Sequence, residues 1–294
     1  MKQIAVVSGK GGTGKTSLVA AFSNLAQPCV VADCDVDAAN LHLVLSPLTD
    51  EIEKEPFYSG YLAKIDQDLC TKCGLCLKNC RFDALTEKDN VFEVMPVLCE
   101  GCGLCVDICP NEAINLKTQH AGELFSYSMR FGQLIQGKLG IAQSTSGKLV
   151  SKVREKAEDI AIKNNSELLL IDGSPGIGCP VIASLTGVDA AVIVSEPTLS
   201  GEHDLLRIAE LCKHFNLPIF VIVNKYDLNS EQTEAIIETC KKIGAHFAGK
   251  INYDKELVEA LSSGKTILEY SNSETSEQIR SAWEYIWGKN QELC

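Results

Sequence analysis

Short apolar runs alternate with longer amphipathic segments along most of the chain. The apolar runs have the length of buried strands, and we expect strands at 2–8, 29–35, 168–172, 190–196, 218–224 and 245–251. The amphipathic segments have helical spacing, and we expect helices at 16–26, 149–165, 203–216 and 231–244. Strands separated by helices of this length form right-handed crossovers and share a parallel sheet covered on both faces. The pattern therefore predicts an α/β fold with a doubly wound parallel sheet.

This alternation is interrupted after Asn40, where prolines and a glycine make the pattern irregular. Residues 61–118 form a cysteine-rich segment with an internal repeat, and the alternation resumes after it. Loops at strand ends tolerate long insertions. We therefore expect a discontinuous α/β domain made of residues 1–60 and 119–294, with a small α+β domain inserted at 61–118.

Composition limits the partners. The chain has 39 acidic and 27 basic residues and a net charge of −12, and without a basic run it should repel nucleic acid and anionic lipid. No apolar run approaches the roughly 20 residues that span a bilayer. The C-terminal segment 276–289 is mixed in charge, so we expect Trp283, Ile286 and Trp287 to pack on the core. With no signal-peptide pattern, we expect a cytoplasmic protein with no nucleic-acid partner and no stable membrane association.

A glycine-rich loop follows the first strand. Residues 9–16, GKGGTGKT, match the phosphate-binding pattern G-x-x-x-x-G-K-[ST] between a strand and a helix. The glycines let backbone N–H groups turn towards phosphates, and the next helix presents its positive end. Lys15 is expected to contact the β and γ phosphates, and the Thr16 hydroxyl to bind Mg²⁺. The expected nucleotide contacts in the loop are Gly11, Gly12, Thr13, Gly14, Lys15, Thr16 and Ser17.

The loop contains a second lysine, Lys10, that this pattern does not require. The form KGGTGKT resembles the deviant loop of the MinD, ParA, Mrp and nitrogenase iron-protein group of ATPases, and LLLIDGSPGIG resembles the group's second switch. The resemblance implies a homodimer that sandwiches nucleotide, with Lys10 reaching the partner's phosphates. It also implies that Asp35 polarises the attacking water and that Asp172 holds Mg²⁺ through water. The expected catalytic residues are thus Lys10, Lys15 and Asp35.

The segment Asn224-Lys225-Tyr226-Asp227 bears on the choice of base. It follows a predicted strand and resembles the N-K-x-D element with which GTPases bind guanine. Asp227 could accept hydrogen bonds from guanine, whereas Asn224 alone can bind N6 and N7 of adenine. We favour ATP because the relatives of the deviant loop use ATP, and GTP remains the alternative.

Eight of the 14 cysteines form two runs with the same spacing. Each run has the form C-x2-C-x2-C-x3-C, which suits [4Fe–4S] clusters better than the zinc site that is the alternative. The segment resembles a two-cluster bacterial ferredoxin. That resemblance implies that the fourth cysteine of each run binds the cluster of the other run. The first cluster would take Cys70, Cys73, Cys76 and Cys109, and the second Cys99, Cys102, Cys105 and Cys80.

Taken together, these features lead to three hypotheses about function. The first is an ATP-hydrolysing dimeric switch coupled to two [4Fe–4S] clusters, which controls electron transfer or the docking of a redox client. The second is a carrier or assembly factor that uses ATP to release an iron–sulfur cluster or metallocofactor to a client protein. The third is a positioning protein of MinD type, in which the clusters are structural.

Overall fold

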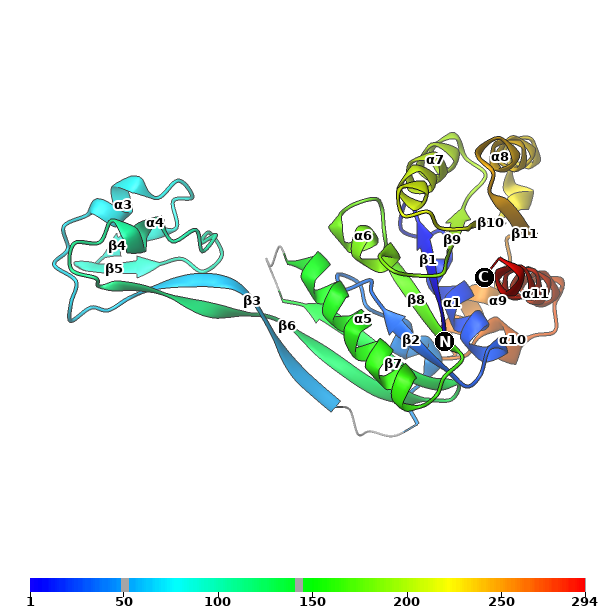
Figure 1. Ribbon diagram of the computed structural model, residues 1–294, viewed down its shortest axis with the longest axis horizontal. Helices are drawn as coiled ribbons and strands as arrows, with labels where there is room; N and C mark the ends of the chain where they lie inside the picture. Colours follow the sequence, from blue (N-terminus) through cyan, green and yellow to red (C-terminus); the bar gives the residue numbers. More distant parts are fainter. Residues whose placement is uncertain (49–52, 141–144, 294) are drawn as a thin grey trace. The chain divides into compact units, whose positions relative to one another are not determined.

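The computed structural model describes residues 1–48, 53–140 and 145–293. The chain divides into two compact units, whose elements are labelled in Figure 1. The first unit comprises Met1–Glu55, Leu124–Lys138 and Ser146–Cys294, and the second comprises Pro56–Glu123 and Leu139–Thr145. The segment expected as an inserted domain, 61–118, lies within the second unit, whose limits are wider.

The described residues contain a nine-stranded sheet in the order β11-β10-β9-β1-β8-β2-β7-β6-β3. From β11 to β7 all neighbouring strands pair in parallel. These parallel strands are β1 (Lys2–Ser8), β2 (Cys29–Asp33), β7 (Gly132–Leu139), β8 (Leu168–Pro175), β9 (Ala190–Ser195), β10 (Ile219–Asn224) and β11 (His246–Ile251). The strands β2, β9 and β10 are buried at every residue, and β1 and β8 at all but one terminal residue, as expected for strands with both faces covered.

Helices cover both faces of the parallel strands. Figure 1 shows α5 (Ser146–Lys163), α6 (Cys179–Leu185) and α7 (Leu199–His214) along one face, where they contact β2, β8 and β9. The helix that follows the glycine loop, α1 (Lys15–Leu25), packs with α11 (Glu274–Glu292) in a core that includes Ile4 and Leu170. The remaining helices of this unit are α2 (Leu41–Leu45), η1 (Tyr226–Leu228), α8 (Ser230–Ile243), α9 (Glu256–Ser262) and α10 (Ile267–Tyr270). The α/β arrangement is confirmed.

The sheet is mostly parallel, as expected, and one edge carries strands that were not predicted. The strands β3 (Glu53–Ile65) and β6 (Ile114–Met129) extend the sheet beyond β7. Along the chain, β6 is connected to β7 by two residues. A two-residue connection permits only an antiparallel hairpin. Both long strands run from one unit into the other. The strand β3 is hard to predict, because it contains Pro56 and Gly60, which interrupt a strand pattern.

The C-terminal segment packs as expected. In α11, Ile279 and Ile286 are fully buried and Trp283 is nearly so, and the Trp283 ring lies 5.0 Å from that of Phe22 in α1. Trp287 packs against the same core. In the described part of the chain, no helix has both the length and the apolar character needed to cross a membrane.

The second unit is small and carries the eight clustered cysteines. It contains α3 (Leu75–Asn79), α4 (Leu104–Asp107) and an antiparallel pair, β4 (Leu85–Lys88) with β5 (Val91–Val94). Its core is built from Ala63, Ile65, Cys76, Leu85, Phe92 and Ile114, with eight other cysteine, leucine or valine positions partly buried against it. Each short helix begins after a glycine with positive φ, Gly74 or Gly103, so the two halves repeat in structure as well as in sequence.

Candidate nucleotide site and cysteine pockets

The glycine loop lies at the carboxyl end of β1 and leads directly into α1. Gly12 and Gly14 have φ of 80° and 89°, a conformation that favours glycine. At Gly14 a Cβ atom would also lie 2.3 Å from Nδ2 of Asn224, so the Asn224 side chain would have to move. The backbone conformation therefore favours glycine, and the approach of Asn224 adds to this preference.

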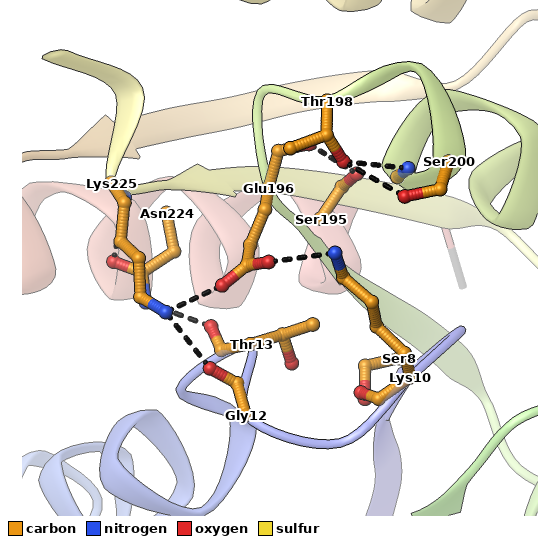
Figure 2. A network of polar contacts seen from close by, with 11 residues as sticks. Ser8, Lys10, Gly12, Thr13, Ser195, Glu196, Thr198, Ser200, Asn224 and Lys225 are labelled. Atoms are coloured by element: carbon orange, nitrogen blue, oxygen red, sulfur yellow. Dashed lines mark hydrogen bonds and ion pairs between the residues drawn. The ribbon is translucent and has the colours of Figure 1, made fainter. Parts of the chain in front are cut away.

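Two side chains from the end of β10 hold the carbonyl groups of the loop. Asn224 Nδ2 donates to the Thr13 carbonyl at 2.8 Å, and Lys225 Nζ donates to the Gly12 carbonyl at 3.0 Å (Figure 2). In a trans peptide the N–H points away from the C=O. The N–H groups of Thr13 and Gly14 are therefore turned to the other side of the loop, as binding of an anion requires.

Beneath the loop lies a buried ion pair. Lys15 Nζ contacts Asp172 Oδ1, and Thr16 Oγ1 donates to Asp172 Oδ2 at 2.9 Å. Burial acts to lower the Lys15 pKa, but the charge and hydrogen bond of Asp172, with Asp35 and Asp33 nearby, outweigh it and raise the pKa. Lys15 is therefore a cation at physiological pH. A phosphate group would compete with Asp172 for it.

Acidic side chains at the end of β2 face the same region. Burial and the nearby Asp172 raise the pKa of Asp33 to about 8, although Lys15 acts to lower it, and Asp33 accepts backbone N–H groups from Asp35 and Leu41. Burial also raises the pKa of Asp35, whose side chain remains partly accessible. A raised pKa improves a carboxylate as an acceptor of a proton from water near neutral pH.

The cavity above the loop has a volume of about 650 Å³, within the range of about 300 to 1,000 Å³ that is typical of small-ligand sites. All the predicted loop contacts line it, together with Lys10, Asp35 and Asn224. Asp172 does not line it and lies below, bonded to Lys15 and Thr16. The Thr13 hydroxyl, which is buried, has no hydrogen-bond partner among the residues that the structure describes. The predicted nucleotide residues other than Asp172 thus line one hollow.

The two candidate base contacts are engaged within the chain. Asn224 is buried, and while its Nδ2 bonds Thr13, its Oδ1 accepts the Lys225 N–H at 3.0 Å. Asp227 Oδ1 accepts the Tyr253 N–H at 2.6 Å. In this conformation the Asn224 amide supports the loop. Its predicted contact with adenine stays a prediction. The wall of the cavity near Tyr253 also contains Leu257 and Val258, which offer apolar surface for a base.

Sequence reasoning missed Glu196. It follows β9, and its carboxylate lies between two cations: Oε2 is 2.9 Å from Lys10 Nζ, and Oε1 contacts Lys225 Nζ (Figure 2). Burial acts to raise the Glu196 pKa, but hydrogen bonds from Lys225 and Lys10 outweigh it and lower the pKa. The signal that could have identified Glu196 is its position at the carboxyl end of β9, the strand that pairs with β1, which leads into the glycine loop.

The eight clustered cysteines of the second unit line two hollows. Cys70, Cys73, Cys76 and Cys109 line a hollow of about 20 Å³. Cys80, Cys99, Cys102 and Cys105 line a cavity of about 390 Å³, to which Cys76 also contributes. Each set combines three cysteines of one run with the fourth of the other, which is the division that the ferredoxin resemblance implies. The described cysteines are all free thiols, and burial raises the pKa of Cys76 and Cys105.

These thiols are not gathered around a single point. Within 1–48, 53–140 and 145–293, no three His, Cys, Asp or Glu side chains are close enough to hold one metal ion. A tetrahedral zinc site would need sulfurs about 4 Å apart. A [4Fe–4S] cube binds each thiolate through a different iron, so its ligands lie further apart. Four thiols around a hollow fit a cube in number and donor type.

Comparison with known proteins defines the family. Residues 4–267 match the model of the CobQ/CobB/MinD/ParA nucleotide-binding domain, so the chain belongs to this family of P-loop proteins. An uncharacterized protein of Methanocaldococcus jannaschii is 36% identical over 97% of this chain and 96% of its own. An iron–sulfur cluster carrier protein of Pyrococcus abyssi is 22% identical over 99% of this chain and 87% of its own.

A solved structure has the same fold. The septum site-determining protein MinD of Pyrococcus horikoshii, in complex with Mg-ADP, aligns with a TM-score of 0.58 and 18% identity over 97% of this chain and 95% of its own. The predicted membership of the MinD and ParA group is confirmed.

Proposed function

We propose that this protein is an ATP-dependent dimeric switch that carries two [4Fe–4S] clusters. The single observation that carries the proposal is that the eight clustered cysteines line two hollows, with Cys76 at both, in a chain whose glycine loop also borders a cavity. ATPases of this family act at the phosphate-binding loop. A nucleotide at that loop can affect the second unit only if it binds with different affinity to two conformations of the chain that differ in the second unit.

The proposed hydrolysis uses residues that already lie around the cavity. The Thr13 and Gly14 N–H groups and Lys15 would bind the phosphates. Thr16, and Asp172 through water, would hold Mg²⁺, which would neutralise charge on the phosphates. Asp35 accepts a hydrogen bond from the attacking water, whose oxygen bonds the γ-phosphorus as the bond to the β-phosphate oxygen breaks. Lys10 of a second copy supplies positive charge to the same phosphates.

In the second unit, Cys70, Cys73, Cys76 and Cys109 would hold one cluster, and Cys80, Cys99, Cys102 and Cys105 the other. Bound clusters would supply one-electron redox chemistry. Backbone N–H groups point at two of these sulfurs: Ala84 donates to Cys80 and Ala113 to Cys109, at 3.4 and 3.3 Å. Such hydrogen bonds stabilise thiolate charge and tune a cluster's potential.

The first experiment combines iron analysis with the crossed ligands. Anaerobically purified protein should contain about eight irons per chain. Cys80→Ala should disturb the cluster of Cys99, Cys102 and Cys105, whereas Cys109→Ala should disturb the other, as seen by electron paramagnetic resonance. One or two metal atoms per chain, or zinc, would exclude two cubes. Loss of the opposite cluster in each variant would overturn the crossed assignment.

The second experiment tests the switch. A non-hydrolysable ATP analogue with Mg²⁺ should drive dimer formation, measured by light scattering, and should shift at least one midpoint potential. By linkage, reduction must change ATP affinity by the same free energy, typically about 1 to 3 kcal/mol. Unchanged potentials and affinities would show that the clusters and the nucleotide act independently.

A carrier function is the second candidate, and one observation favours it: the relative in Pyrococcus abyssi is an iron–sulfur cluster carrier protein. The two functions differ in whether the clusters stay bound. An electron-transfer protein should keep both clusters when it is mixed with a cluster-free client ferredoxin. A carrier should lose iron to that client, and the loss should depend on the nucleotide.

A further inference from the structure

Glu196 lies between Lys10 and Lys225 on a backbone that is held in place. Its carbonyl accepts the Thr198 N–H at 2.8 Å, and Thr198 caps α7 by accepting the Gly201 N–H at 2.9 Å. A Cβ on Gly201 would lie 2.3 Å from the same carbonyl oxygen, so α7 can begin this close to Glu196 only with glycine at position 201. The carboxylate therefore projects from a rigid turn at the edge of the loop.

The two lysines bonded to Glu196 differ in their other contacts. Lys225 also donates to the Gly12 carbonyl and is part of the support of the loop. Lys10 has the more exposed side chain, 36% against 27%. Within the part of the chain that the structure describes, its ionic contact is with Glu196 (Figure 2). If Glu196 lost its charge, Lys225 would keep its bond to the loop, whereas Lys10 would lose the contact that directs it inwards.

We propose that Glu196 is a positioning residue that holds Lys10 against its own loop until a second nucleotide-loaded chain presents its phosphates. This inference rests on the proposed dimeric switch and assigns a regulator to it. Lys10 cannot contact Glu196 of its own chain and the phosphates of another chain at once. Each chain must therefore break this pair when the dimer forms, and the pair opposes dimer formation.

The size of the effect follows from the exposure of the pair. A partly exposed ion pair contributes about 0.2 to 1 kcal/mol, and a symmetric dimer breaks two of them. Glu196→Gln keeps the shape of the side chain and removes its charge. We expect it to lower the protein concentration at which the ATP-analogue-bound dimer is half formed by about fivefold.

The test compares four chains by sedimentation with the Mg²⁺-bound analogue: wild type, Glu196→Gln, Lys10→Ala and the double variant. The double variant should behave as Lys10→Ala, because Glu196 acts through Lys10. Glu238→Gln, which removes the same charge from an exposed pair with Lys241 on α8, is the matched control and should leave the midpoint unchanged. An unchanged or higher midpoint in Glu196→Gln would overturn the proposal.

A second measurement separates this inference from the switch itself. In the nucleotide-free protein, Glu196→Gln should increase the rate at which an acylating reagent modifies Lys10, read by mass spectrometry, with Lys241 as internal reference. An unchanged Lys10 rate would overturn the pairing. If the rate rises but the wild type never dimerises, the pairing of Glu196 with Lys10 is supported. The proposed dimeric switch is then wrong, and so is the role of Glu196 in dimer formation.

Discussion

The nucleotide site and the cysteine pockets differ in what holds their side chains in place. Around the loop, charged and polar side chains bond one another: Lys15 with Asp172, Glu196 with two lysines, and Asn224 with the loop carbonyl. In the second unit, the residues that define the pockets are thiols in a small core. A site held by its own hydrogen bonds keeps its shape without a ligand, whereas a small core of thiols depends on what the thiols bind.

Removal of the iron that the second unit is proposed to hold should give the largest difference between the two regions. Small domains with bound metal commonly unfold without it, so we expect the second unit to lose hydrogen-exchange protection when a chelator strips iron anaerobically. The first unit should stay folded. Both tryptophans of the chain lie in α11 of that unit, so their fluorescence should not change. Retained protection in the second unit would show that its core is sufficient alone.

Lys15→Ala should have the next largest effect, on the first unit. It leaves the Asp172 carboxylate, 1% exposed, without its cation, and breaking such a buried pair costs about 3 to 5 kcal/mol of unfolding free energy. Nucleotide binding should also be lost. Tryptophan-monitored denaturation and calorimetry measure the two effects. Lys10→Ala, in a more exposed pair, should cost less than about 1 kcal/mol, and equal costs would contradict this account.

Asn224→Ala should weaken nucleotide binding by about tenfold. It leaves the Thr13 carbonyl without its donor, and an unsatisfied buried group costs about 1 to 3 kcal/mol. Asn229→Ala is the matched control, because Asn229 caps α8 through Gln232 and should reduce stability without changing affinity. Calorimetric titration with ATP distinguishes the two. If both variants bind equally well, the loop does not need this support.

The smallest effect concerns pH. The Glu196 pKa lies below its ordinary value of 4.5, so the carboxylate stabilises the fold above pH 4.5 and loses this contribution as pH falls through the folded value. Wild type should therefore lose slightly more unfolding free energy than Glu196→Gln when the pH is lowered below 4.5. Parallel denaturation curves for the two chains at each pH would contradict the lowered pKa.

The sequence predicts contiguous features of the fold and site well. The loop, the strand before it and the helix after it form one continuous pattern, so Lys15 and Thr16 could be placed without coordinates. Glu196 could not, because its partners come from the ends of β1 and β10 and meet only in the folded sheet. The strand β3 was missed because its first four residues are all exposed, so the alternation that marks a strand begins only at Phe57.

The neighbouring positions of β3 and β6 have a consequence for how such a protein can arise. The chain leaves the sheet along one of these strands and returns along the other, and the two are adjacent in the strand order. A short turn could join them as a hairpin, so a whole unit could be gained there without rearranging any other strand. This edge is a natural site for exchanging one accessory module for another during evolution, or for grafting in the laboratory.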